Sequence, residues 1–194
     1  MLVRNSVSFF TLVILSGNAI FSLFWIFTYW LLNNHLWKIS WINKLLGMGI
    51  NTPILLGRWE GSLDRTNEES KETDDEHIDD FVLEIKQSFI SVSCQTFANN
   101  KANKKGKSSS TYAELLYDGH QKAFTLYYIW KGDDNTIEGG ERFFDGTTKL
   151  TVLNGNKTLD GEYYTNRNPY QTKGTLLLHH KHKECYGTHD VNKK

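Results

Sequence analysis

The chain has 194 residues with 22 basic and 22 acidic side chains, so its formal net charge is zero. The charge is unevenly distributed: the first 56 residues contain only Arg4, Lys38 and Lys44, and the rest contains 19 basic and 22 acidic side chains. This asymmetry excludes a single soluble globule, and the lack of domain-wide positive charge excludes an ordinary nucleic-acid-binding domain. Two cysteines, Cys94 and Cys185, without a Cys-x-x-Cys motif exclude a disulfide framework and a zinc cage.

Residues 7–32 form a run of 26 residues without a charged side chain. As a helix this run would be about 39 Å long, whereas a hydrocarbon core is about 30 Å thick. A cleaved signal peptide is the alternative, but it would need a shorter apolar run and a cleavage site of small residues. We therefore predict a transmembrane anchor within residues 1–56.

Aromatic residues and lysines follow this run. The aromatic residues form a belt of the kind found at a headgroup interface: Trp25, Tyr29, Trp30, Trp37 and Trp41. Residues 35–50 then read as an amphipathic helix lying in the interface, with Lys38 and Lys44 extending towards the headgroups. The lysine and arginine count leaves the orientation of the span open.

A polar stripe runs along the predicted span. Ser8, Thr11, Asn18 and Ser22 fall on one helix face, because they recur through Leu15 at alternating steps of three and four. In lipid, such a stripe typically faces another helix or a water-filled path. We infer self-association through this face; the alternative is that the hydroxyls bond back to their own helix.

From residue 57 the hydrophobic pattern changes to a period of two, which indicates strands. Eight strands are expected, at residues 57–63, 81–87, 90–97, 110–117, 122–131, 147–153, 158–165 and 173–180. Turn signals such as Asp118-Gly119 and the run Asn154-Gly155-Asn156 separate them, and no helical pattern intervenes. The prediction is an all-β fold, an eight-stranded antiparallel up-and-down barrel over residues 57–194.

Three polar stretches lie between or after these strands. Residues 64–80 hold nine acids against two bases and are expected to be a solvated loop. Residues 98–107 hold four lysines, which predicts either a solvated turn or a contact with anionic lipid or an acidic loop. At the end of the last strand and beyond it, His179, His180, His182 and His189 indicate a solvated tail rather than a metal site.

Strand alternation assigns inward-facing residues, among them Trp59, Leu83 and Ile90. In the strand at 158–165 the inward face changes from apolar Leu159 to Tyr163 and Thr165, and Arg167 continues the alternation. This pattern predicts a barrel that is closed at one end and polar at its mouth. Arginine suits phosphate and aromatic rings suit bases; the alternative is that Arg167 pairs with a loop carboxylate.

No catalytic constellation stands out. The chain lacks a GxSxG motif, a P-loop and an HExxH motif, and Tyr, Thr and Arg do not make a general acid–base pair at neutral pH. We expect a protein that is not an enzyme and that needs no metal or cofactor.

Short motifs in a fixed order resemble one known family. They are GRWEG at 57–61, IKQ at 85–87, ISV at 90–92, Thr96, SSS at 108–110, AEL at 113–115, LYY at 126–128, GT at 146–147, LDGEYYTNR at 159–167 and GTL at 174–176. The chain resembles the membrane-anchored β-barrel effectors of bacterial CBASS antiphage systems, the SMODS-associated two-transmembrane, β-strand-rich effectors. The resemblance covers nearly the whole of residues 57–194.

The resemblance implies a lipocalin-like barrel on the cytoplasmic side of the bacterial inner membrane. This barrel would sense a cyclic oligonucleotide made by a CD-NTase, and the chain would then oligomerise and disrupt the bilayer, leading to abortive infection. The family has two transmembrane helices, whereas this sequence shows one convincing span.

We therefore expect a cyclic dinucleotide as the activating ligand, the lipid bilayer and further copies of the chain as partners, and no nucleic-acid polymer. Tyr163, Thr165 and Arg167 are the first candidates for ligand contact, and Gln87, Thr96, Ser110 and Tyr128 are the second. One alternative is a membrane-tethered lipocalin-type carrier of a small apolar ligand. Another is a membrane protein whose barrel only docks a partner.

Overall fold

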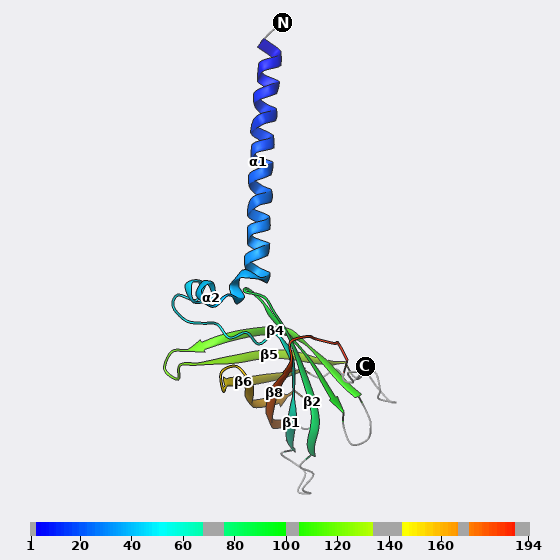
Figure 1. Cartoon of the computed structure of the whole chain (residues 1–194). Coiled ribbons are helices and arrows are strands. Elements are labelled where there is room, and N and C mark those ends of the chain that lie inside the picture. Colours follow the sequence, from blue (N-terminus) through cyan, green and yellow to red (C-terminus); the bar gives the residue numbers. More distant parts are fainter. Residues whose placement is uncertain (1–2, 68–75, 100–104, 134–144, 167–170, 189–194) are drawn as a thin grey trace. The chain divides into compact units, whose positions relative to one another are not determined.

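The computed structural model describes residues 3–67, 76–99, 105–133, 145–166 and 171–188 (Figure 1). The chain separates into two compact units, Met1–Asn51 and Thr52–Lys194.

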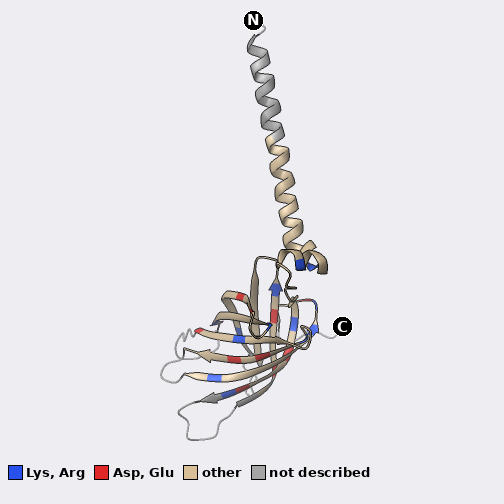
Figure 2. Ribbon diagram, turned by 90° about the vertical axis from the view of Figure 1, so that its left-hand side faces the viewer, with Lys and Arg blue, Asp and Glu red and all other residues tan. Residues whose placement is uncertain are grey.

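The first unit is helical. It contains α1 (Val3–Asn34), the 3₁₀ turn η1 (Leu36–Lys38) and α2 (Ser40–Leu46). From residue 18 to residue 34, α1 carries no Lys, Arg, Asp or Glu (Figure 2). The interfacial helix expected at 35–50 is interrupted, because Ile39 adopts an extended backbone (φ −76°, ψ 122°) between η1 and α2.

The predicted membrane span is not confirmed. Within the part of the chain that the structure describes, no helix combines the length and the hydropathy needed to cross a bilayer.

The second unit is a closed β-barrel. Its strands are β1 (Gly57–Asn67), β2 (Glu76–Gln87), β3 (Val92–Asn99), β4 (Lys105–Asp118), β5 (Ala123–Asp133), β6 (Asp145–Leu153), β7 (Thr158–Thr165) and β8 (Thr172–His182). Each strand pairs antiparallel with the next one in the sequence, and β8 pairs antiparallel with β1. The prediction of an eight-stranded antiparallel up-and-down barrel is confirmed.

Several strand boundaries differ from those expected. β1 and β2 extend into the predicted acidic loop, and β4 begins at Lys105 rather than at residue 110. Polar side chains do not prevent these extensions, because the ladder is made by backbone groups that every non-proline residue carries. Loop composition therefore overestimates the length of the loops.

The strand expected at 90–97 begins two residues later, at Val92. A tight turn precedes it, in which the Ser88 amide donates to the Ser91 carbonyl at 2.8 Å and the Ser91 amide donates to the Ser88 hydroxyl at 3.2 Å. Ile90 lies in this turn and is 63% exposed, so its prediction as an inward residue is wrong.

The turn between β6 and β7 matches its sequence signal. Asn154, Gly155 and Asn156 all have positive φ values, of 50°, 64° and 67°. Asparagine and glycine are the residues that tolerate this left-handed conformation best, which is why the run predicts a turn here.

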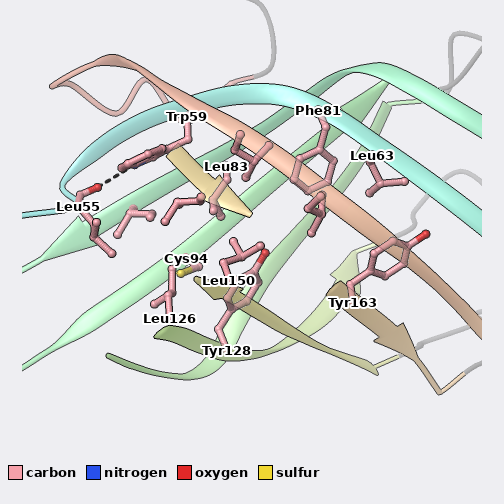
Figure 3. Packing of buried hydrophobic residues seen from close by; sticks show 14 residues of the cluster. Leu55, Trp59, Leu63, Phe81, Leu83, Cys94, Leu126, Tyr128, Leu150 and Tyr163 are labelled. Carbon is pink, nitrogen blue, oxygen red and sulfur yellow. Dashed lines mark hydrogen bonds between the residues drawn. The ribbon is translucent and has the colours of Figure 1, made fainter. Parts of the chain in front are cut away.

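Fourteen buried side chains form one cluster inside the barrel (Figure 3). Trp59, Leu83, Ile85, Leu126 and Leu150 are among those with no exposed surface. They occupy alternate positions of their strands, as a period of two requires when one face of a sheet is buried.

Candidate functional site

The two ends of the barrel differ in how the strands are connected. At one end, which we call the closed end, β2 meets β3, β4 meets β5 and β6 meets β7 through turns of four residues. At the opposite end, which we call the loop end, β7 finishes at Thr165 and β8 begins at Thr172. The connections that the structure leaves undescribed also attach at the loop end.

The closed end is sealed by the residues that precede β1. The Gln87 side chain accepts a hydrogen bond from the Leu55 amide at 2.6 Å and donates one to the Pro53 carbonyl at 2.9 Å. The Trp59 indole donates to the Leu55 carbonyl at 2.8 Å, as drawn in Figure 3. Leu55 and Trp59 have no exposed surface, so these residues plug this end of the barrel.

The apolar cluster continues from this plug, and burial favours the neutral forms of Cys94 and Tyr128 within it. Burial raises the pKa of the Cys94 thiol far above its usual range. Burial also raises the pKa of the Tyr128 phenol, and the neighbouring Cys94 adds to this rise. A fully buried apolar cluster favours uncharged side chains, because burying a charge without a partner costs free energy.

Towards the loop end the buried side chains become polar. Thr96 on β3 and Ser108 on β4 share a short hydrogen bond between their hydroxyls. Thr165 on β7 and Thr172 on β8 are hydroxyl partners at 2.5 Å, and the Thr172 amide donates to the Thr165 hydroxyl at 3.1 Å. These four side chains are at least nine-tenths buried, and the pairing satisfies polar groups that water does not reach.

Two aromatic rings border this polar region, and a glycine on the adjacent strand makes room for each. Trp130 pairs with Gly146, and Tyr163 pairs with Gly174. A Cβ atom at either glycine would collide with the facing ring, so only glycine fits at these positions. The Trp130 indole also donates to the Thr148 hydroxyl at 3.0 Å, which fixes the orientation of its ring.

The structure brings some of the predicted ligand-contact residues together and separates others. Tyr163 and Thr165 lie near the loop end of β7, and Thr96 lies towards the same end of β3. Tyr128 lies within the apolar cluster, where its phenol is hydrogen-bonded to Thr148.

Two other candidates have structural partners elsewhere. Gln87 holds the plug at the closed end. Ser110 accepts a hydrogen bond from the Cys94 amide at 2.9 Å, on the seam between β3 and β4. Arg167 lies outside the described residues, so its role stays a prediction.

The remaining predicted site is the polar stripe of α1. The Ser22 hydroxyl donates to the Asn18 carbonyl at 2.8 Å, which is the intrahelical alternative for this residue. The Asn18 residue is exposed. The side chains of Ser8 and Thr11 lie outside the described residues.

The sequence-based site missed Thr148, Thr172 and Ser108. Each of them forms a side-chain hydrogen bond with a residue that was predicted to face inward. Extending the alternation of inward and outward side chains through the full length of each strand would have identified them. Among the residues with described positions, no group of three His, Cys, Asp or Glu side chains is placed to hold a metal ion.

A second buried polar cluster lies on the outer face of the barrel. Glu84 accepts hydrogen bonds from the Tyr186 and Gly187 amides at 2.7 and 2.8 Å, and Arg58 donates to Glu84 at 3.4 Å and to the Thr188 carbonyl at 2.7 Å. Residues 183–188 are mostly exposed, as expected for a solvated tail, but these contacts hold residues 186–188 against β1 and β2. His179, His180 and His182 belong to β8, and His189 lies outside the described residues.

A comparison with protein-family models gives one match. Residues 50–180 match the model described as Cap15, cyclic dinucleotide receptor domain. No curated protein and no solved structure gives a significant match to the chain. The matched range contains the plug, all of β1–β7 and most of β8, which are the elements that form the closed barrel. The chain therefore belongs to the family of the Cap15 cyclic dinucleotide receptor domain.

Proposed function

We propose that the chain is a CBASS antiphage effector whose barrel binds a cyclic dinucleotide at the loop end. The observation that carries this proposal is that the barrel interior has two different halves. It gains its meaning from the family, because the chain belongs to a family of cyclic dinucleotide receptor domains. One half is apolar and plugged, and the other half carries hydroxyls and two aromatic rings. We therefore place the entry of the ligand at the loop end.

The side chains near the loop end suit the parts of a cyclic dinucleotide. The rings of Tyr163 and Trp130 offer platforms on which bases can stack. The hydroxyls of Thr165 and Thr172 can exchange their mutual hydrogen bond for bonds to ribose or base edges. Arg167 comes two residues after β7, and its planar guanidinium would bind phosphate; this role rests on the sequence alone.

Membrane action completes the proposal. The uncharged run in α1 anchors the chain in the bacterial inner membrane, with the barrel in the cytoplasm. The ligand, made by a CD-NTase partner, shifts the chain towards an oligomer that disrupts the bilayer and causes abortive infection. Binding must then be tighter in the oligomer than in the free chain, because only differential affinity shifts such an equilibrium.

The chain acts in this proposal as a receptor and not as an enzyme, and it uses no metal or cofactor. The alternative of a lipocalin-type carrier is less well supported. A carrier stores its apolar ligand in the barrel interior, and here Leu83, Leu126, Leu150 and other fully buried side chains occupy the apolar half.

Isothermal titration calorimetry of the detergent-solubilised full chain, across a panel of cyclic dinucleotides and trinucleotides, tests this function. We expect at least one cyclic dinucleotide to bind. Arg167→Ala should weaken this binding by roughly 10- to 150-fold, because it removes a charge-assisted contact to phosphate. Lys149→Ala is the matched control, since it removes an exposed cation from the outer face of β6.

The outcomes separate the proposal from its alternatives. If no member of the panel binds, the receptor function of this chain is refuted. If a cyclic dinucleotide binds equally well to the Arg167→Ala variant and to the wild type, Arg167 is not part of the site. Binding of a fatty acid or another apolar ligand instead would favour the carrier.

A further inference from the structure

Among the described strand pairs of the closed barrel, β3 and β4 have the shortest ladder. These strands pair over only five positions, from Gln95↔Ser109 to Asn99↔Lys105. On its other side β4 pairs with β5 as far as Asp118↔Ala123. The second half of β4, residues 111–118, therefore has a paired strand on one side only, and the hairpin tip extends beyond the other strands (Figure 1).

This half of β4 has an open edge with few of the features that normally protect one. An open edge presents backbone donors and acceptors to any other strand, and proteins usually guard it with lysine, proline or a short strand. Residues 111–117 contain neither lysine nor proline. A register shift between Ser110 and Tyr112 disturbs only the start of the edge.

The outward side chains of this edge are large and exposed. Tyr112 is 53% exposed and Leu116 is 42% exposed, and Ile129 on the adjacent β5 is 43% exposed. The one charged group between Tyr112 and Leu116 is the Glu114 carboxylate, which accepts a hydrogen bond from the Tyr112 hydroxyl on the same strand. The edge thus combines backbone hydrogen-bonding groups with apolar surface.

We infer that this edge of β4 pairs with the same edge of a second copy of the chain. Antiparallel pairing about a two-fold axis at Leu115 would place Glu114 of each copy opposite Leu116 of the other. An axis at Glu114 would oppose two glutamates, and an axis at Leu116 would oppose Glu114 and Asp118. Like charges directly opposite one another destabilise a strand pair, so the axis at Leu115 is favoured.

A groove at the base of the edge fits this arrangement. It has a volume of about 170 Å³ and is lined by Glu84 and Lys86 and by serines of β3 and β4, including Ser109 and Ser110. With the axis at Leu115, residues 118 and 119 of the second copy would lie opposite residues 112 and 111, next to this groove.

The turn next to the groove is preorganised by its own hydrogen bonds. The Asp118 carboxylate folds it by accepting hydrogen bonds from the His120 and Gln121 amides at 2.8 and 3.2 Å. In the groove, Glu84 is already bonded to the Tyr186 amide, while Lys86 is exposed. Residues 118–122 carry one carboxylate, Asp118, and one cation, Lys122, so the tip of the second copy brings no net charge to the groove.

Cysteine cross-linking tests both the edge and its register. Two variants of the full chain in detergent, Glu114→Cys and Leu116→Cys, are mixed and oxidised with and without a cyclic dinucleotide. The axis at Leu115 predicts cross-linked dimers in the mixture and far fewer in either variant alone, because only Glu114 and Leu116 lie directly opposite each other. Ile129→Cys is the control, being equally exposed but one strand from the edge.

A charge substitution gives a second readout. Leu116→Glu should raise the dissociation constant of the dimer by at least about tenfold in sedimentation velocity, because it places a carboxylate directly opposite Glu114 in both halves of the pairing. Ile129→Glu should leave it unchanged. No cross-linking in the mixture under either condition, or equal cross-linking by Ile129→Cys, overturns the interface, and dimers of Glu114→Cys alone overturn the register. Calorimetry on the same samples reports ligand binding separately, so failure of the interface does not imply failure of the proposed function.

Discussion

The side-chain amide of Gln87 holds the residues that precede β1 against the end of β2. It bonds both the Pro53 carbonyl and the Leu55 amide, and Leu55 is fully buried. Gln87→Leu would leave these two backbone groups without their partner, and each such loss costs about 1–3 kcal/mol. We expect urea denaturation to show a loss of roughly 2–4 kcal/mol in the free energy of unfolding.

The matched control for this substitution is Gln95→Leu. The Gln95 amide makes one exposed hydrogen bond, to the Ser109 hydroxyl at 3.3 Å, so its loss should cost less than about 1 kcal/mol. Equal stability of the two variants would show that the plug does not depend on Gln87.

Cys94 makes the stability of the barrel sensitive to alkaline pH. Burial raises the pKa of this thiol, so the folded chain keeps its proton where the unfolded chain loses it. Below about pH 9 the thiol is protonated in both states and contributes no pH dependence; above it, unfolding releases a proton and stability falls by about 1.4 kcal/mol per pH unit. Urea denaturation between pH 8 and 10.5 should show this slope.

Cys94→Ala should reduce the alkaline slope by that amount. Cys185→Ala should change it less, because the Cys185 thiol is only partly buried, although burial raises its pKa too. The same slope in wild type and Cys94→Ala would mean that the thiol does not titrate differently in the two states.

At the scale of elements, the tail after β8 is held by contacts that the sequence pattern does not predict. The Glu84 carboxylate binds two successive amides of the tail, and Arg58 closes the cluster from β1. Glu84→Gln keeps the shape of the side chain but removes its charge, which weakens bonds that are typically worth about 1.5–3 kcal/mol each.

We therefore expect faster proteolysis of the tail in Glu84→Gln. Trypsin cleavage after Lys183, followed by mass spectrometry, should accelerate about tenfold or more, since the tail opens more often. Glu114→Gln, an exposed substitution on β4, should leave the rate unchanged. Equal rates for all three proteins would mean that the tail is held by other contacts.

Element order and strand pairing were predictable because they depend on local signals. The period of two and the turn residues locate all eight strands, and inward residues such as Trp59 and Tyr163 follow from alternation. Strand ends were less predictable, because β1 and β4 continue through polar residues by backbone pairing alone.

The partners of buried polar groups were beyond the sequence. Alternation places Arg58 on the outer face, and it is only 2% exposed because a tail about 130 residues later covers it. Gln87 was predicted to face a ligand, and its amide instead meets the plug. Such partners are set by the closed three-dimensional fold and leave no periodic signal in the chain.

For the whole molecule, action on a membrane should depend on α1 as well as on the barrel. If the polar stripe faces neighbouring copies, Asn18→Leu removes an interhelical hydrogen bond worth roughly 0.6–2 kcal/mol per contact, repeated at every junction of an oligomer. With an active CD-NTase, we expect this variant to insert and bind ligand normally but to show less dye entry and fewer cross-linked oligomers.

A hydrophobic control keeps this test specific. Ala19→Leu introduces the same apolar side chain at the adjacent position, off the stripe, and should act like the wild type. Full permeabilisation and wild-type oligomers in Asn18→Leu would mean that the stripe does not face other copies. Its polar side chains would then bond within their own helix, as the Ser22 hydroxyl does.

The pairing of β1 with β8 also decides when the barrel can form during synthesis. The first strand must wait for the last, because Gly61 pairs with Leu178 and the Trp59 ring meets His180 at 5.0 Å between ring centroids. Such non-local contacts make folding slow, and they cannot form until β8 has left the ribosome. Until then the nascent sheet has two unpaired edge strands and an uncovered Trp59, so chaperones should bind the nascent chain until β8 has emerged.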